Sequence, residues 1–137
     1  MSTKAALIPD ALLIRVATMA IGSPPLPIAL PEQATTFVPP ADGKYLEVRY
    51  FQNQAAWEGM SKGVLDQGLL QVTVVWPKNK GLIAPIEAAG LVAAHMPKGL
   101  LLFHGGTKIK INREPRIAAP LAEDTEVRVP VVFSWVA

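Results

Sequence analysis

The stretch GLLQVTVVWP, residues 68–77, decides the fold, because it reads as a long β-strand with almost no polar side chains. Alternation along a strand sends successive side chains to opposite faces of the sheet. One face then carries Leu70, Val72, Val74 and Trp76, and the other carries Leu69, Gln71, Thr73 and Val75. Antiparallel sheets usually bury one face and wet the other. The second face of this strand, with only two small polar residues, therefore needs a cover.

The size and charge of the chain set its class. Its 137 residues suit one domain, residues 1–137, and a chain of this length buries enough surface to form a stable core without disulfides or structural metal ions. The chain has no cysteine, which excludes disulfides, thiolate metal sites and cysteine nucleophiles. Thirteen basic and eleven acidic side chains leave a formal charge of +2, too small an excess to grip a phosphate backbone. We therefore expect no specific binding of nucleic acid.

The composition is unusually apolar, with 50% hydrophobic and only 18% charged residues. Soluble domains carry about 25% charged residues. We expect no membrane span, because every stretch of about 18 residues contains a charged residue or a proline. Pro9, Asp10 and Arg15 likewise interrupt the N-terminal apolar stretch and argue against a signal peptide. Exposed apolar surface on soluble proteins usually marks a protein–protein interface, and we expect one here.

The first half of the chain predicts a helix over residues 9–21, with Pro9 as its first helical residue, and a half-buried strand over residues 44–51. Between that strand and the long one lies QNQAAWEGMSKG, residues 52–63, which has no periodicity. Loops of about twelve residues are uncommon and often functional. This loop carries Trp57 and Met60, two residue types favoured at interfaces. The alternative is that Trp57 folds back onto the core.

A second helix is predicted over residues 82–96, and it is apolar on nearly every side. One side carries Ile83, Ile86, Ala89, Gly90, Ala93 and Ala94. Leu91 and Val92 occupy much of the rest. In a domain of this length one side meets the sheet, and the other is a candidate contact for a neighbouring subunit. We assign Leu91 and Val92 to that contact, together with Gln71 and Thr73 on the second face of the long strand.

The last third of the chain predicts a hairpin over residues 100–113 around the turn Gly105–Gly106. A polar connection, residues 114–125, leads to a final strand over residues 126–137. Pro130 removes a ladder donor, which predicts an edge or a bulge at that point. The order of elements is helix, three strands, helix, then two or three strands. This indicates the α+β class, with a mainly antiparallel sheet flanked by two helices in a single domain.

Residues able to carry chemistry are few. His95, near a helix end, and His104, beside the glycine turn, have no second metal ligand at a recognised spacing. The acidic run EDTE, residues 123–126, matches no calcium loop and is typical of a solvated turn. The serines lack a nucleophile elbow. We expect no catalytic site, no cofactor and no metal, and we interpret the chain as a non-enzyme.

The ordered set of segments resembles a known family over nearly the whole chain. The segments are FVPPADGKYLEVRYF, GLLQVTVVWPKNKG, a small-residue helix ending AAHMPKG, then HGGTKIKI and a closing VRVPVVFSWVA. Together they are similar to the tail terminator, or tail-completion, proteins of long-tailed bacteriophages and tail-like particles. No single segment is diagnostic. The order of the set carries the resemblance.

The resemblance implies a structural protein of the virion, assembled in the host cytoplasm and placed at the head-proximal end of the tail. It implies a ring of identical copies, six in number, that stops growth of the tail tube protein and meets the head–tail connector protein. DNA would pass through the ring without specific binding. Two alternatives stay open: a connector or stopper component of the same particle, and a cellular enzyme or small ligand-binding module of the α+β class that uses His95, His104 or residues 123–126.

Overall fold

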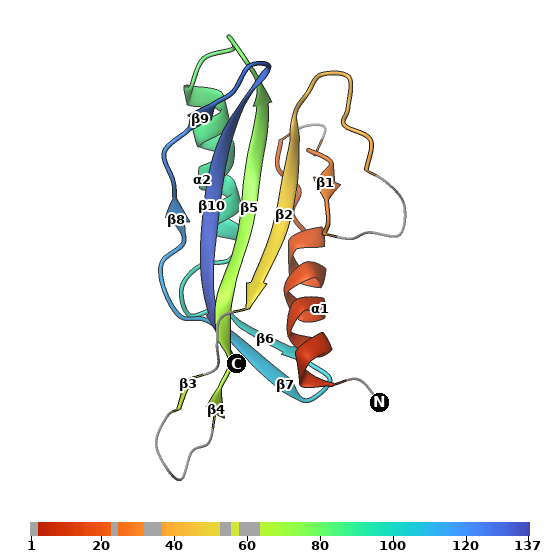
Figure 1. The fold of residues 1–137 in the computed structure, drawn as a ribbon, viewed down its shortest axis with the longest axis vertical. Helices are drawn as coiled ribbons and strands as arrows, with labels where there is room; N and C mark the ends of the chain where they lie inside the picture. The colour runs from red at the N-terminus through yellow and green to blue at the C-terminus, as the bar shows by residue number, and fades with distance from the viewer. Residues whose placement is uncertain (1–2, 23–24, 32–36, 53–55, 58–63) are drawn as a thin grey trace.

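A computed structural model gives the fold as two helices packed on a curled sheet (Figure 1), and it describes residues 3–22, 25–31, 37–52, 56–57 and 64–137. The helices are α1 (Lys4–Ala17) and α2 (Ile83–His95). The longer strands are β2 (Tyr45–Gln52), β5 (Gln67–Pro77), β6 (Leu101–His104), β7 (Thr107–Ile111) and β10 (Glu126–Val136). The two-residue strands are β1 (Ile28–Ala29), β3 (Ala56–Trp57), β4 (Val64–Leu65), β8 (Arg116–Ile117) and β9 (Leu121–Ala122).

The sheet is built around residues 68–77, which lie in β5. Within the described residues its strand order is β1-β2-β5-β10-β7-β6, and β8 and β9 also pair with β10. Strands β5 and β10 pair antiparallel over eleven residues each, from Gln67 opposite Val136 to Pro77 opposite Glu126. The pair β1–β2 is parallel. The α+β class therefore holds for a sheet that is mixed, with one parallel pair among antiparallel ones.

The core lies on one face of this sheet, as the alternation predicts. The buried core side chains of the three long strands are Leu46, Val48, Leu70, Val72, Val74, Val127, Val129, Val131, Phe133 and Trp135. Helix α2 packs on β5 and β10, while α1 packs on the β6–β7 hairpin. Ile109 and Ile111 of that hairpin and Leu12 of α1 are fully buried. Both helices therefore cover the same face.

Helix α1 begins at Lys4 and not at residue 9, so Pro9 lies inside it. The prediction of Pro9 as the first helical residue is wrong. A proline in the second turn of a helix forfeits one backbone hydrogen bond. Packing outweighs that loss, because Ile8, Leu12 and Val16 at helical spacing are each 0% exposed. The helix ends at Ala17, where the N–H groups of Thr18 and Met19 donate to Arg15 and Val16.

Pro130 lies in a central strand and causes no bulge, because the register of β10 with β5 runs through Pro130 opposite Thr73 without interruption. Its carbonyl accepts a hydrogen bond from the N–H of Ala118, on the side of β8 and β9. A strand residue directs its N–H and C=O groups to the same side. The N–H group that Pro130 lacks would therefore point toward β8 and β9, which pair with only part of β10. The connection predicted over residues 114–125 contains those two short strands.

Two hairpins complete the fold. Gly105 and Gly106, with φ of 55° and 83°, close the predicted β6–β7 hairpin with the conformation that a two-residue turn requires. The region predicted as an aperiodic loop contains β3, which pairs with β4 beyond the end of the main sheet (Figure 1). Residues 53–55 and 58–63, which include Met60, lie outside the described residues.

Candidate assembly surfaces

The second face of β5 is covered by charged side chains from the two neighbouring strands. Arg128 of β10 forms ion pairs with Glu47 at 3.2 Å, with Glu123 at 3.6 Å and with Glu126. Arg49 also pairs with Glu47, at 3.1 Å. Burial lowers the pKa of Arg128, but the charges of Glu47 and Glu126 and their hydrogen bonds raise that pKa by more. The guanidinium therefore stays charged at any physiological pH.

The register explains why the side chains in the middle of this face are shielded from solvent by the charged pair. Glu47 lies opposite Thr73 and Arg128 lies opposite Val75, so their ion pair crosses β5 diagonally. Thr73 and Val75 are only 3% and 1% exposed. Gln71 donates a hydrogen bond to the Thr73 hydroxyl at 3.1 Å and remains half-buried. The cover that the sequence required is thus a polar one, supplied within the chain.

Helix α2 carries the apolar surface instead. Its buried side is made of Pro85, Ala88, Ala89 and Val92. Its outer side exposes Ile83 at 77% and Leu91 at 52%, with Ile86 beside them. Leu91 therefore lies where a partner can reach it, whereas Val92 is 0% exposed and belongs to the core. The side that carries Ile83 and Ile86 faces outward, so the helix is rotated relative to the predicted orientation.

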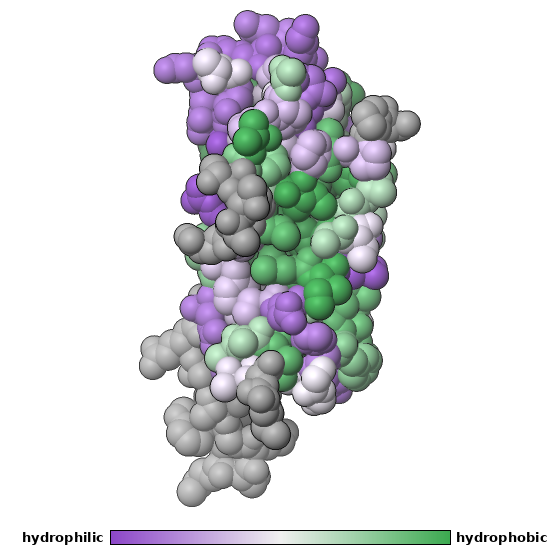
Figure 2. Space-filling model, turned by 90° about the vertical axis from the view of Figure 1, so that its right-hand side faces the viewer, coloured by the Kyte–Doolittle hydropathy of each residue, from purple (hydrophilic) through white to green (hydrophobic). Residues whose placement is uncertain are grey.

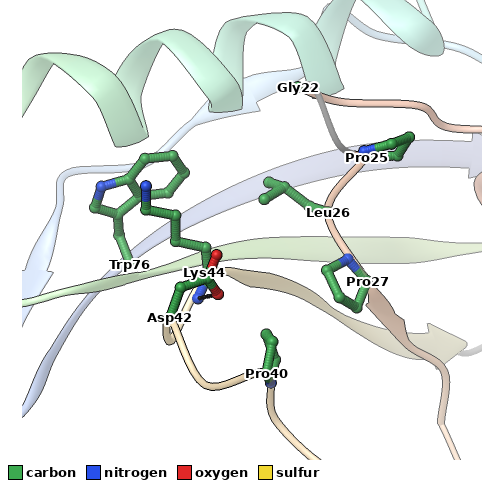
Figure 3. A pocket seen from close by; sticks show the side chains of 8 residues that line it. All are labelled: Gly22, Pro25, Leu26, Pro27, Pro40, Asp42, Lys44 and Trp76. Carbon is green, nitrogen blue, oxygen red and sulfur yellow. Dashed lines mark hydrogen bonds between the residues drawn. The ribbon is translucent and has the colours of Figure 1, made fainter.

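Beside α2 runs a depression that we call the furrow, lined by Ile21, Leu26, Trp76, Ala84, Glu87 and Leu91. It continues past Trp76 into a second hollow lined by Pro25, Pro27 and Pro40 (Figure 3). There the Lys44 ammonium lies 4.7 Å from the centre of the Trp76 ring. Figure 2, which looks onto the side of α1 and β1, shows hydrophobic side chains gathered in the middle of this face, below a hydrophilic upper end.

The size of these hollows favours contact with a protein side chain over a small ligand. Their volumes are about 200 Å³ and 280 Å³. Small-molecule sites span roughly 300–1,000 Å³ and enclose most of their ligand. The furrow is shallow, and among the described residues that line it only Glu87 is charged. It suits an apolar side chain presented by another protein.

A second apolar surface lies on the β6–β7 hairpin. Phe103 is opposite Lys108, and Leu101 is opposite Lys110. Cross-strand partners share a face, and Ile109 and Ile111 point to the core, so these four side chains point away from it. Phe103 is 73% exposed and Leu101 is 43% exposed. We call Leu101, Phe103, Lys108 and Lys110 the hairpin surface.

The histidines have structural partners. His95 Nε2 lies 2.8 Å from the Thr18 hydroxyl, and the backbone carbonyl of His95 accepts a hydrogen bond from the Arg15 guanidinium. These contacts join the end of α2 to the end of α1. His104 pairs with Asp10 at 2.6 Å and ties the hairpin to α1. Among the described residues, no three His, Asp or Glu side chains are grouped to hold a metal ion. None of the described helices is long and apolar enough to cross a membrane.

Sequence reasoning missed Phe103 and Leu101, although a signal was present. The Gly105–Gly106 turn fixes a two-residue loop, and Lys108 and Lys110 alternate with two isoleucines. That register places Phe103 and Leu101 on the lysine side, away from the core. Of the other predicted contact residues, Trp57 lies in β3 and Met60 lies outside the described residues.

Comparison with known proteins identifies the family. One solved structure has 26% sequence identity and a TM-score of 0.80, and the match covers 98% of this chain and 96% of that one. A chain in the virion of a native gene transfer agent particle has the same fold, with 13% identity, a TM-score of 0.66, and coverage of 99% and 98%. Among curated proteins none matches. The family model for phage tail terminator proteins matches residues 7–135, and the chain therefore belongs to this family of structural tail proteins.

Proposed function

We propose that the chain caps the head-proximal end of a phage tail tube as a closed ring of six copies. In this role it stops addition of tail tube protein and presents the surface that meets the head–tail connector. The observation that carries the proposal is the family match over residues 7–135. The single chain adds support, because it exposes two unlike apolar surfaces, the outer side of α2 with the furrow and the hairpin surface.

A ring needs such a pair of surfaces. Copies related by rotation contact one another head to tail, so each copy uses two different patches. Phe103, Ile83 and Leu91 are exposed by 73%, 77% and 52% in the single chain. Contiguous apolar patches on soluble proteins usually mark an interaction site. Burial of these side chains between copies would also account for the low charged fraction of 18%.

The β3–β4 hairpin is our candidate contact with the tube or the connector. It extends beyond the end of the main sheet (Figure 1). Trp57 lies in β3, opposite Val64. Aromatic residues are enriched at interface cores. We expect Trp57→Ala to weaken tail capping while ring formation persists, and unchanged capping by this variant would contradict the assignment.

The proposed ring is a conduit for DNA and not a DNA-binding protein. Each phosphate that a protein neutralises strengthens binding, and a strong grip would retain the duplex. The chain carries a formal charge of only +2. On the second face of the sheet, the cations Arg49 and Arg128 are both paired with carboxylates. We therefore expect no measurable affinity of the ring for duplex DNA at physiological salt.

The test is assembly of tails with and without the chain, in cells that make all the other particle proteins. We expect tubes of uncontrolled length without it, seen by electron microscopy as a broad length distribution, and tubes of uniform length with it. Native mass spectrometry of the purified chain, or of tube tips, should give a six-copy species. Uniform, head-joined tails without the chain would refute the proposal. Binding to heads and not to tube ends would indicate a connector.

A further inference from the structure

The hairpin surface carries an exposed aromatic side chain, and the furrow is a mainly apolar hollow. Phe103 is 73% exposed, and it stands on a tight hairpin. The furrow is an open hollow walled by Leu26, Trp76 and Leu91. A protruding aromatic ring and an apolar hollow form the kind of anchor and pocket that dominates protein interfaces.

Their charges are also complementary. Lys108 lies beside Phe103 across the hairpin, and Lys110 lies beside Leu101. Glu87 lines the furrow. None of these three forms an ion pair with a described residue, so each is available to a partner. Lys44 and Asp42 lie together on the far side of Trp76, where the N–H of Lys44 donates to Asp42 at 3.1 Å (Figure 3).

One copy cannot fill its own furrow. The hairpin lies at the lower end of the molecule, and it is held there by the pair His104–Asp10 and by the close approach of Gly105 to Leu7 (Figure 1). The furrow lies at the opposite end, where β5 runs out at Trp76 and Pro77 and α2 begins. The occupant must therefore come from another molecule.

We propose that this occupant is the hairpin of a second copy of the chain, with Phe103 packed between Leu26, Trp76 and Leu91 of its neighbour and Lys108 facing Glu87. The inference rests on the proposed ring and names its contact. A furrow-to-hairpin contact joins unlike surfaces, so every copy in a closed ring makes it once through each surface.

The experiment uses the absence of native cysteines. In the double variant Leu91→Cys with Phe103→Cys, oxidation of assembled tails or of the purified ring should give a ladder of covalent oligomers that ends at the ring size. Either single variant should give no product above a dimer. A ring that persists while the double variant gives no ladder would overturn this contact and leave the proposed function standing. If the unmodified chain forms no ring and does not control tail length, both this contact and the proposed function are refuted.

Two further experiments test the inference without cysteine substitutions. Phe103→Ser should raise the concentration at which half of the rings dissociate by roughly tenfold or more, because a buried aromatic anchor is lost. Phe51→Ser is the matched control: Phe51 is 45% exposed on β2, outside both surfaces, and its loss should leave dissociation unchanged. Lys108→Glu and Glu87→Lys should each weaken the ring, and their combination should restore it. Independent effects of the two charge reversals would contradict the contact.

Discussion

Gly68 is the position where one added methyl group tests the packing of the sheet most sharply. A Cβ atom placed there would lie 2.2 Å from the carbonyl oxygen of Phe51 and 2.6 Å from Cζ2 of Trp135. Ordinary contacts begin at 3.4 Å, so the first falls short by 3.4 − 2.2 = 1.2 Å. Neither neighbour can yield easily. One is backbone, and Trp135 is 0% exposed and stacked on Tyr50 with ring centres 5.7 Å apart.

The expected cost of Gly68→Ala follows from two opposing effects. Overpacking a core costs about 1–3 kcal/mol, and a clash with backbone belongs at the upper end. Replacing glycine by alanine within a strand returns about 0.5–1 kcal/mol of backbone entropy. The net loss in the free energy of unfolding is about 2 kcal/mol, which lowers the Tm of a domain of this size by about 8 °C.

The assay is thermal and urea unfolding followed by circular dichroism at one fixed protein concentration, because assembly would shift the Tm with concentration. Gly90→Ala is the matched control: nothing lies within 4 Å of a Cβ atom at Gly90, which is in the middle of α2. That variant should gain about 0.5–1 kcal/mol from helix propensity. A Gly68→Ala variant as stable as the unmodified chain would refute the packing argument.

Further substitutions test the polar cover and the orientation of α2. Arg128→Met leaves Glu123 and Glu126 without their cation and Glu47 with Arg49 alone, and it should cost about 1–2 kcal/mol in urea unfolding, since the side chain is 23% exposed. Glu123→Gln removes an exposed partner and should cost less than about 0.5 kcal/mol. On α2, Val92→Ser should cost about 2–4 kcal/mol in thermal unfolding of the monomer, whereas Leu91→Ser should stay within about 0.5 kcal/mol. Equal losses for the last two would place the helix in another orientation.

The elements with clear periodicity could be predicted from the sequence. The two long strands and the strand before them show an alternation of two, and in the 68–77 stretch the less polar face, which carries Val72, is the face that packs in the core. The 82–96 helix was predicted within one residue at each end. Long-range contacts decided the rest. Pro9 is tolerated inside α1 because that helix is anchored by its buried side, and β8 and β9 exist only as partners of β10.

The candidate surfaces were harder to predict than the fold. A helix apolar on every side has no polar stripe to show which side meets the sheet, so Leu91 and Val92 could not be told apart. The small residues Ala88 and Ala89 face the sheet, because they allow α2 to approach the strands closely, and the larger Ile83 and Ile86 are left outside.

This arrangement explains where the apolar excess of the composition goes. The second face of β5, which the sequence alone marks as uncovered, is closed by the Glu47–Arg128 pair within the chain. Part of the excess lies instead on α2 and on β6, toward opposite ends of the molecule (Figure 1). Apolar side chains kept at two distant, unlike surfaces do nothing for the isolated chain, whereas a head-to-tail ring buries both at once. The ring contact proposed for Phe103 is thus the step that would give this composition a physical reason.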